Sequence, residues 1–406
     1  MYSVASCEAE ISSRQEKTGS IGRADVHAVW KFLLACVASP FTSEHLRALR
    51  ASAVDELDWD AALSIAGAQG LLPLLHERLA EIGDVVPDVI RGAVTRAFEQ
   101  NARQTLWLTQ VLFNVIDLLQ RHSIEALPYK GPVLAQLLYG NVTLRQYSDV
   151  DIIVRAADVS RARAVLQDGG FTSALHLSVR EEQAYIATGY EYTFHAGRYT
   201  NILEFQWRVL PDFYAVDFDM AEFFRCSQKI GIGERTLATL GNEDLLLVLC
   251  AHAAKHGWSK LSWTREVAEL GQSRNLDWDR VIRGCRTLGL KRIAATTFCL
   301  AWKMLATPVP AAVLPFIEQD DAVGRIAEEV FRGLESGQDC EVESLAYFRF
   351  MTQLRERWRD RMRFWSRLAA TPSLSEWAVV RLPGVLFPLY RGIRFARLGA
   401  RLIRGR

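Results

Sequence analysis

The stretch LPYKGPVLAQLLYGNVTLRQYSDVDIIV, residues 127–154, decides the fold that this sequence predicts. It ends in SDVDIIV, where β-branched residues alternate with acids over residues 150–154, a pattern typical of a strand. Alternate side chains of a strand share a face, so Asp149 and Asp151 should project together while Ile152 turns to the opposite, buried side. The stretch therefore predicts a strand with one acidic face and one core face.

Two carboxylates held close together repel one another, and a hard cation such as Mg²⁺, which prefers oxygen ligands, relieves that repulsion. The pair is therefore a candidate platform for metal-assisted phosphoryl chemistry, which normally needs a third carboxylate on a neighbouring strand. Glu204 is the best candidate, because it lies mid-strand on the polar-leaning face of residues 201–209. Glu191, on the preceding predicted strand, stays open as the alternative.

Candidate phosphate-binding groups lie upstream of the acidic strand. Lys130 and Gly131 form a predicted turn directly before a short helix over residues 133–139. The open N–H groups of a helix N-terminus can hold phosphate, and the lysine adds a positive charge. Arg145 could clamp a triphosphate oxygen, and Ser148 could donate a hydrogen bond to the same group. Each of these side chains could instead have a purely local structural role.

Together these motifs are similar to the uncharacterised nucleotidyltransferase family of the DNA polymerase β-like superfamily. The matching features, in chain order, are Lys130-Gly131, Tyr139-Gly140, Arg145 and Asp149-Val150-Asp151. The later segment HAAKHGWSKLSWTREVAELG, residues 252–271, also resembles the helical domain of that family. The resemblance covers residues 25–400.

Some positions depart from the family pattern. The third strand carries Gln206 where the family has a histidine, and the helix after the histidines carries Glu266 where the family has an aspartate. The wider superfamily also has a Gly-Ser turn in place of Lys130-Gly131. These differences concern the third carboxylate and the way in which a triphosphate is held.

The resemblance implies an Mg²⁺-dependent nucleotidyltransferase that uses ATP or another NTP, with Mn²⁺ as an alternative metal. Two ions would bind Asp149 and Asp151, and one of them would be shared with Glu204. An acceptor oxygen would attack the α-phosphorus in line and release pyrophosphate. No residue selects among a small molecule, a protein side chain and RNA as the acceptor.

The remainder of the chain has mostly helical periodicity. Predicted helices cover residues 25–38, 59–82 with a break near Gly70, 87–122, 157–168, 242–255, 262–271, 278–288 and 293–305, and further predicted strands cover residues 190–195 and 201–209. The predicted fold is α+β, a small polymerase-β-like mixed sheet embedded between N- and C-terminal helical regions. The predicted organisation is a flexible tail (1–24), an N-terminal helical region (25–123), the nucleotidyltransferase core (124–212), a C-terminal helical domain (213–380) and a basic C-terminal helix (381–406).

The chain has 406 residues, with 48 Lys and Arg against 47 Asp and Glu, so its net charge gives no sign of a stable nucleic-acid complex. Its seven cysteines form no CxxC pair, which indicates reduced thiols and no zinc site. The N-terminus has no apolar signal core, and no 18 apolar residues run together. We therefore expect a cytoplasmic protein.

Two other features leave alternatives open. His252 and His256 are one helical turn apart, which would suit a metal, but no third ligand has suitable spacing and interface histidines are the better interpretation. Residues 382–406 hold six arginines and no acid. This segment could meet RNA or an anionic membrane surface, or it could be a solvated face.

The competing hypothesis for the whole chain is a non-catalytic module that keeps the fold and binds nucleotide or a partner protein. The position of Glu204 separates the two hypotheses. A Glu204 side chain far from Asp149 and Asp151 would favour the non-catalytic module.

Overall fold

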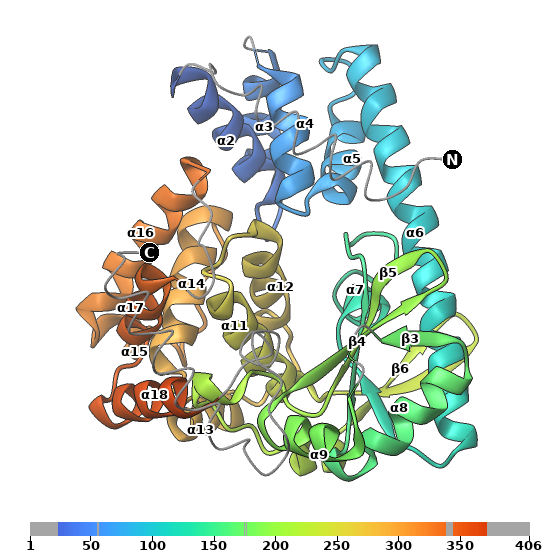
Figure 1. Cartoon of the computed structure of the whole chain (residues 1–406). Helices are drawn as coiled ribbons and strands as arrows, with labels where there is room; N and C mark the ends of the chain where they lie inside the picture. The colour runs from blue at the N-terminus through green and yellow to red at the C-terminus, as the bar shows by residue number, and fades with distance from the viewer. Residues whose placement is uncertain (1–22, 55–56, 174, 176, 338–343, 372–406) are drawn as a thin grey trace.

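A computed structural model of the chain describes residues 23–54, 57–173, 175, 177–337 and 344–371. In this part of the chain, helices precede and follow a five-stranded mixed sheet (Figure 1). This arrangement confirms the predicted α+β fold class. The predicted tail lies almost entirely outside the described residues, as does the predicted basic C-terminal segment 381–406.

The N-terminal region is helical, as the periodicity predicts. Its elements are α2 (Arg23–Val37), α3 (Ser43–Val54), α4 (Trp59–Ala68), α5 (Leu72–Glu81) and α6 (Asp88–Arg121). Gly70 separates α4 from α5 with a φ of +74°, a left-handed conformation that glycine adopts without steric cost. Helix α3 was not predicted, because half of its residues are polar and it lies between two stronger apolar patterns.

The strands of the sheet and the helices that connect them lie within residues 126–206. Its strands and helices are β1 (Ala126–Pro128), α7 (Gly131–Tyr139), β2 (Val150–Val154), η1 (Ala156–Asp158), α8 (Val159–Asp168), β3 (Phe171–Ser173), α9 (Val179–Thr188), β4 (Glu191–Ala196) and β5 (Tyr199–Gln206). The strand order is β1-β2-β5-β4-β3, in which β2 and β5 are parallel and the other pairs are antiparallel. The acidic strand is thus next to the strand that carries Glu204.

The predictions for this region need correction at two boundaries and omit two elements. Helix α7 begins at Gly131 and not at residue 133, because Pro132 occupies the first helical turn, where its missing N–H costs no hydrogen bond. Strand β5 ends at Gln206 and not at residue 209, since the chain turns toward Pro211 and the short helix η2 (Asp212–Tyr214). Strand β3 and helix α9 were not predicted.

The C-terminal region is helical except for one hairpin. Its elements are α10 (Met220–Arg225), β6 (Gln228–Ile232), β7 (Arg235–Thr239), α11 (Asn242–Lys255), α12 (Leu261–Gly271), α13 (Trp278–Leu288), α14 (Lys291–Leu305), α15 (Leu314–Glu318), α16 (Asp321–Glu335), α17 (Leu345–Gln353) and α18 (Trp358–Ala370). The helical domain predicted for residues 213–380 also contains these two strands, β6 and β7, which were not predicted. These strands pair around Gly233, whose positive φ suits a tight turn.

Both faces of strand β2 are buried, each against a different apolar cluster. Ile152 packs in a cluster with Leu112 and Val115 of α6, as predicted for the core face. Ile153, on the other face, belongs to a cluster that includes Leu245 of α11 and the N-terminal helices. The face that carries Asp151 is therefore covered by the C-terminal helices, and α11 and α12 lie opposite the sheet in Figure 1. No helix in the described residues is both long enough and apolar enough to span a membrane.

Candidate active site

The predicted acids come together where β2 and β5 run side by side. Asp151 and Glu204 are direct partners in the parallel register, and Asp149 lies one residue before β2 begins. Asp151 is 3% exposed. Burial and the neighbouring Asp151 carboxylate raise the pKa of Asp149 to about 6. Burial, with the carboxylates of Asp151 and Glu191, raises the pKa of Glu204 to about 8.

Lys130 provides a positive charge inside this acidic group. It is the residue before α7, is 7% exposed, and its Nζ lies 3.2 Å from Asp151 Oδ1. The same ammonium lies 3.3 Å from Nδ1 of His252 on α11. Burial alone would lower the pKa of Lys130, but the surrounding acids, Asp151 first, raise it above its ordinary value. Lys130 is therefore a fixed cation within the described site.

Gly131 allows the backbone to pass close to the acidic strand. Its φ is +52°, and a Cβ atom built on it would lie 3.0 Å from the carbonyl oxygen of Asp149. Both features favour glycine, because a side chain would be strained by the left-handed conformation and crowded by the backbone. The start of α7 and the start of β2 are thus held in direct contact.

Glu204 is bonded to a residue of its own strand. Gln206 Nε2 donates to Glu204 Oε2 at 3.0 Å, and Gln206 Oε1 accepts from the hydroxyl of Tyr129 at 2.7 Å. Gln206 is 3% exposed, and Tyr129 is fully enclosed. Tyr129 was not predicted as a site residue. It follows Leu127 by two residues, so the alternation of a strand places these two side chains on the same face at this edge of the sheet.

Glu191, on β4, joins Asp149, Asp151 and Glu204 on one face of the sheet, which we call the acidic face. It is the register partner of Gln206, and burial raises its pKa. Lys255 of α11, which is half-buried, contributes a second ammonium, whose Nζ donates to the hydroxyl of Tyr190 at 3.5 Å. Burial lowers the pKa of Lys255 in spite of the carboxylates near it. Neither Lys255 nor Tyr190 was predicted, since their proximity depends on how α11 docks on the sheet.

Arg145 has a protein partner. Its Nε donates to Glu266 Oε1 of α12 at 2.8 Å, and both side chains are buried. Glu266 is the position at which the sequence departs from the aspartate of the family pattern. Ser148, in contrast, is exposed and directly precedes Asp149. The structure brings Arg145 close to the acids but also assigns it a structural ion pair.

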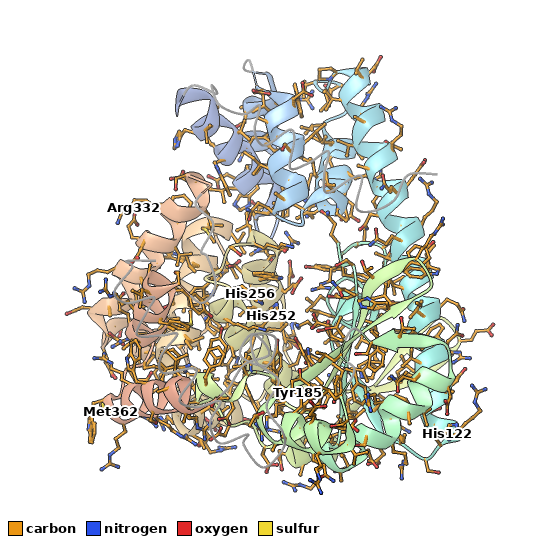
Figure 2. The ribbon with its side chains drawn as sticks, viewed as in Figure 1. His122, Tyr185, His252, His256, Arg332 and Met362 are labelled. Carbon is orange, nitrogen blue, oxygen red and sulfur yellow. The ribbon has the colours of Figure 1, made fainter. Side chains whose placement is uncertain are left out.

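His252 and His256 form a three-ring cluster with Trp263, and Figure 2 shows the two histidines side by side among the C-terminal helices. Their ring centroids are 4.8 to 5.1 Å apart. Burial, followed by the charge of Lys130, lowers the pKa of His252 well below its usual range. Burial lowers the pKa of His256 to about 3. Both imidazoles are neutral at physiological pH, so His252 can accept a hydrogen bond from Lys130.

The fit of a metal ion can be judged from the charges and the donor atoms. Four carboxylates (Asp149, Asp151, Glu191 and Glu204) and two ammonium groups (Lys130 and Lys255) influence one another here. With all of them ionised the group has a formal charge of −2, before the exposed Lys260 at its rim is counted. Hard oxygen donors with this deficit of positive charge suit Mg²⁺ or Mn²⁺. Across the described residues, however, no three acidic, histidine or cysteine side chains are already gathered as a metal cage. The donor chemistry fits, and ion binding would require the carboxylates to draw together.

The comparison with known proteins agrees with the motif analysis. A family model described as uncharacterised nucleotidyltransferase matches residues 55–306, which include α4 to α14 and the whole acidic face. No curated protein and no solved structure matches the chain.

Proposed function

The chain belongs to the uncharacterised nucleotidyltransferase family, and we propose that it transfers a nucleoside monophosphate from a nucleoside triphosphate to an acceptor hydroxyl. Membership of this family gives the general role, nucleotidyl transfer. The acceptor oxygen would form a bond to the α-phosphorus while the bond from that phosphorus to the bridging oxygen breaks. Pyrophosphate would leave with the electron pair, and the acceptor proton would pass to water.

One observation supports this proposal above the others, the cross-strand pairing of Asp151 with Glu204 beside Asp149. Burying several carboxylates together is costly unless a cation compensates them. The raised pKa values of Asp149 and Glu204 express that cost. A protein gains nothing in stability from such a cluster, so its presence favours a ligand-binding role.

Asp149, Asp151 and Glu204 are the residues that we propose as metal ligands. A bound Mg²⁺ or Mn²⁺ ion would supply charge stabilisation to the phosphate oxygens and to the acceptor oxygen. The protein itself would position the reactants and exclude water, because the acidic face lies between the sheet and α11.

The triphosphate is proposed to lie at the start of α7. Lys130 is already at this position, and Gly131 carries the N–H group at the start of α7, since Pro132 has none and the N–H of Val133 donates to the carbonyl of Lys130 at 3.2 Å. The exposed hydroxyl of Ser148 is available beside Asp149. Arg145 would contribute through its positive charge while it keeps Glu266 as a partner.

A direct test is the release of pyrophosphate from each NTP with Mg²⁺ or Mn²⁺, measured for wild type and Asp151→Asn. Asp117→Asn is the matched control, because Asp117 forms an ion pair with Arg235 on the surface. We expect Asp151→Asn to lose activity by at least about 100-fold and Asp117→Asn to keep it. Equal pyrophosphate release by folded wild type and Asp151→Asn would reject the enzymatic role for the substrates tried.

The second candidate function is nucleotide binding without transfer. The contact between Lys130 and Asp151 favours it, because that ammonium satisfies a carboxylate that catalysis would require for a metal. Calorimetric titration of a non-hydrolysable ATP analogue distinguishes the two functions. Binding that is strong without a divalent ion, and unchanged in Asp151→Asn, would favour the non-catalytic module.

A further inference from the structure

Gln206 lies two residues after Glu204 on β5, so both side chains are on the same face of the sheet. Its amide links the Glu204 carboxyl to the hydroxyl of Tyr129. Its register partners are Ile153 on β2 and Glu191 on β4. From this position the amide accepts from the Tyr129 hydroxyl at 2.7 Å and donates to Glu204 Oε2 at 3.0 Å. Three side chains, those of Gln206 and Glu204 on β5 and of Tyr129 directly after β1, thus form one continuous hydrogen-bond chain that ends on the carboxylate.

The chain has a defined direction. A phenol that is buried near carboxylates stays protonated, and burial does raise the pKa of Tyr129 above its ordinary value. The Tyr129 hydroxyl therefore always has a proton to donate, and the amide oxygen of Gln206 is the group that accepts it. The amide nitrogen then faces Glu204, and a 180° rotation of the amide would set the carbonyl oxygen of Gln206 against the ionised Glu204 carboxylate, which has no proton to donate.

Glu204 needs such a donor. When it is ionised, its carboxylate repels that of Asp151, which is directly opposite it on β2, and this repulsion pushes the two side chains apart. A donor fixed to Oε2 holds the carboxylate in one orientation and leaves Oε1 for another partner. Gln206 is neutral, so it offsets the repulsion without competing for a cation.

We propose that Gln206 is the positioning residue for Glu204, oriented by Tyr129, and that it sets how well the acidic face binds a divalent ion. This inference rests on the proposed function, in which Glu204 is a metal ligand. Residues that orient a metal ligand typically contribute 10- to 100-fold to metal affinity or activity. Gln206 acts only through Glu204 and does not itself contact the reactants.

The inference is tested by calorimetric titration of the full-length protein with Mn²⁺. Gln206→Leu removes both hydrogen bonds at similar volume, and Gln206→Asn is one methylene too short to reach both partners. We expect each to weaken Mn²⁺ binding about 10-fold, and kcat to fall more than the KM for NTP rises. Tyr129→Phe removes the orienting proton alone, so it should weaken Mn²⁺ binding by a smaller factor.

A control separates lost positioning from lost structure. Gln228 donates its amide to the Leu240 carbonyl and to Asn242 away from the acids, so Gln228→Leu should keep wild-type Mn²⁺ affinity. Wild-type affinity in Gln206→Leu and Gln206→Asn would overturn the inference, and Tyr129→Phe decides it if neither variant folds. A wild-type protein that binds no Mn²⁺, with or without NTP, would instead reject the proposed function.

Discussion

Lys130 donates from its ammonium nitrogen to the Asp151 carboxylate 3.2 Å away, and both side chains are buried. The ammonium has a second acceptor at 3.3 Å, the neutral imidazole of His252. A cation that binds Asp151 would therefore not leave Lys130 without a partner. Lys130 balances part of the negative charge of the acids in this structure. In the proposed function, a metal ion would balance that charge instead, and Lys130 would turn toward a phosphate.

The first prediction concerns Lys130→Met, which keeps the length of the side chain and removes its charge. Asp151 would then be a buried, unpaired carboxylate, so we expect a loss of about 3 kcal/mol in the free energy of unfolding without metal. Added Mn²⁺ should restore part of this loss, since it supplies the missing charge. Thermal unfolding with and without Mn²⁺ measures both effects, and the exposed Lys229→Met is the control. A metal-free Lys130→Met protein as stable as wild type would contradict the prediction.

The second prediction concerns pH in the absence of metal. The pKa of Glu204 is raised from 4.5 to about 8, so its contribution to stability is complete below pH 4.5 and is lost as the pH rises through 8. The pKa of His256 is lowered from 6.5 to about 3, so its effect runs the opposite way and is complete by pH 6.5. Between pH 6.5 and 8 we therefore expect Tm to fall, and to fall less in Glu204→Gln.

This pH prediction has a simple control and a clear contrary outcome. Glu99→Gln alters an exposed carboxyl on α6 and should leave the slope between pH 6.5 and 8 unchanged. Saturating Mn²⁺ should flatten the slope in wild type, because an ion that binds the ionised carboxylates displaces their protons. A slope that is the same in wild type, Glu204→Gln and Glu99→Gln would show that Glu204 does not titrate in this range.

Local patterns predicted the elements of the site well. Strand β2, helix α11 and helix α13 have the predicted bounds, because residues 150–154, 242–255 and 278–288 each carry an unbroken periodicity. The same-face placement of Asp149 and Asp151 follows from strand geometry alone. The hairpin of β6 and β7 was missed, since its alternation includes lysine, arginine and glycine and resembles that of a polar helix.

The partners of the site residues could not be predicted in the same way. Arg145 and Glu266 are 121 residues apart, and Lys130 and His252 are 122 residues apart. Such contacts depend on how α11 and α12 dock on the sheet, which periodicity does not encode. Gln206 is an intermediate case, because its position drew attention as a departure from the family pattern but its two hydrogen bonds did not follow from it.

The third prediction separates the two roles of Arg145. Arg145→Met leaves Glu266 buried and unpaired, so urea unfolding should show a loss of about 3–5 kcal/mol. Glu266→Gln also breaks the charge pair but keeps the guanidinium near the acids. If Arg145 contacts the triphosphate, NTP should bind about 10-fold more weakly to Arg145→Met and not to Glu266→Gln. Equal NTP affinity in the two variants would leave Arg145 with the structural role alone.

The last prediction compares two glycines of left-handed conformation at the two ends of α7. Gly131 and Gly140 have φ values of +52° and +67°, so replacing either with alanine costs about 1–2 kcal/mol from the backbone alone. A Cβ atom at Gly131 would also lie 3.0 Å from the Asp149 carbonyl oxygen, whereas one at Gly140 would meet nothing within 4 Å. We therefore expect Gly131→Ala to lose more stability than Gly140→Ala in urea unfolding, and only Gly131→Ala to weaken Mn²⁺ binding. Similar losses in both variants would show that the contact between α7 and the start of β2 does not matter for the acidic face.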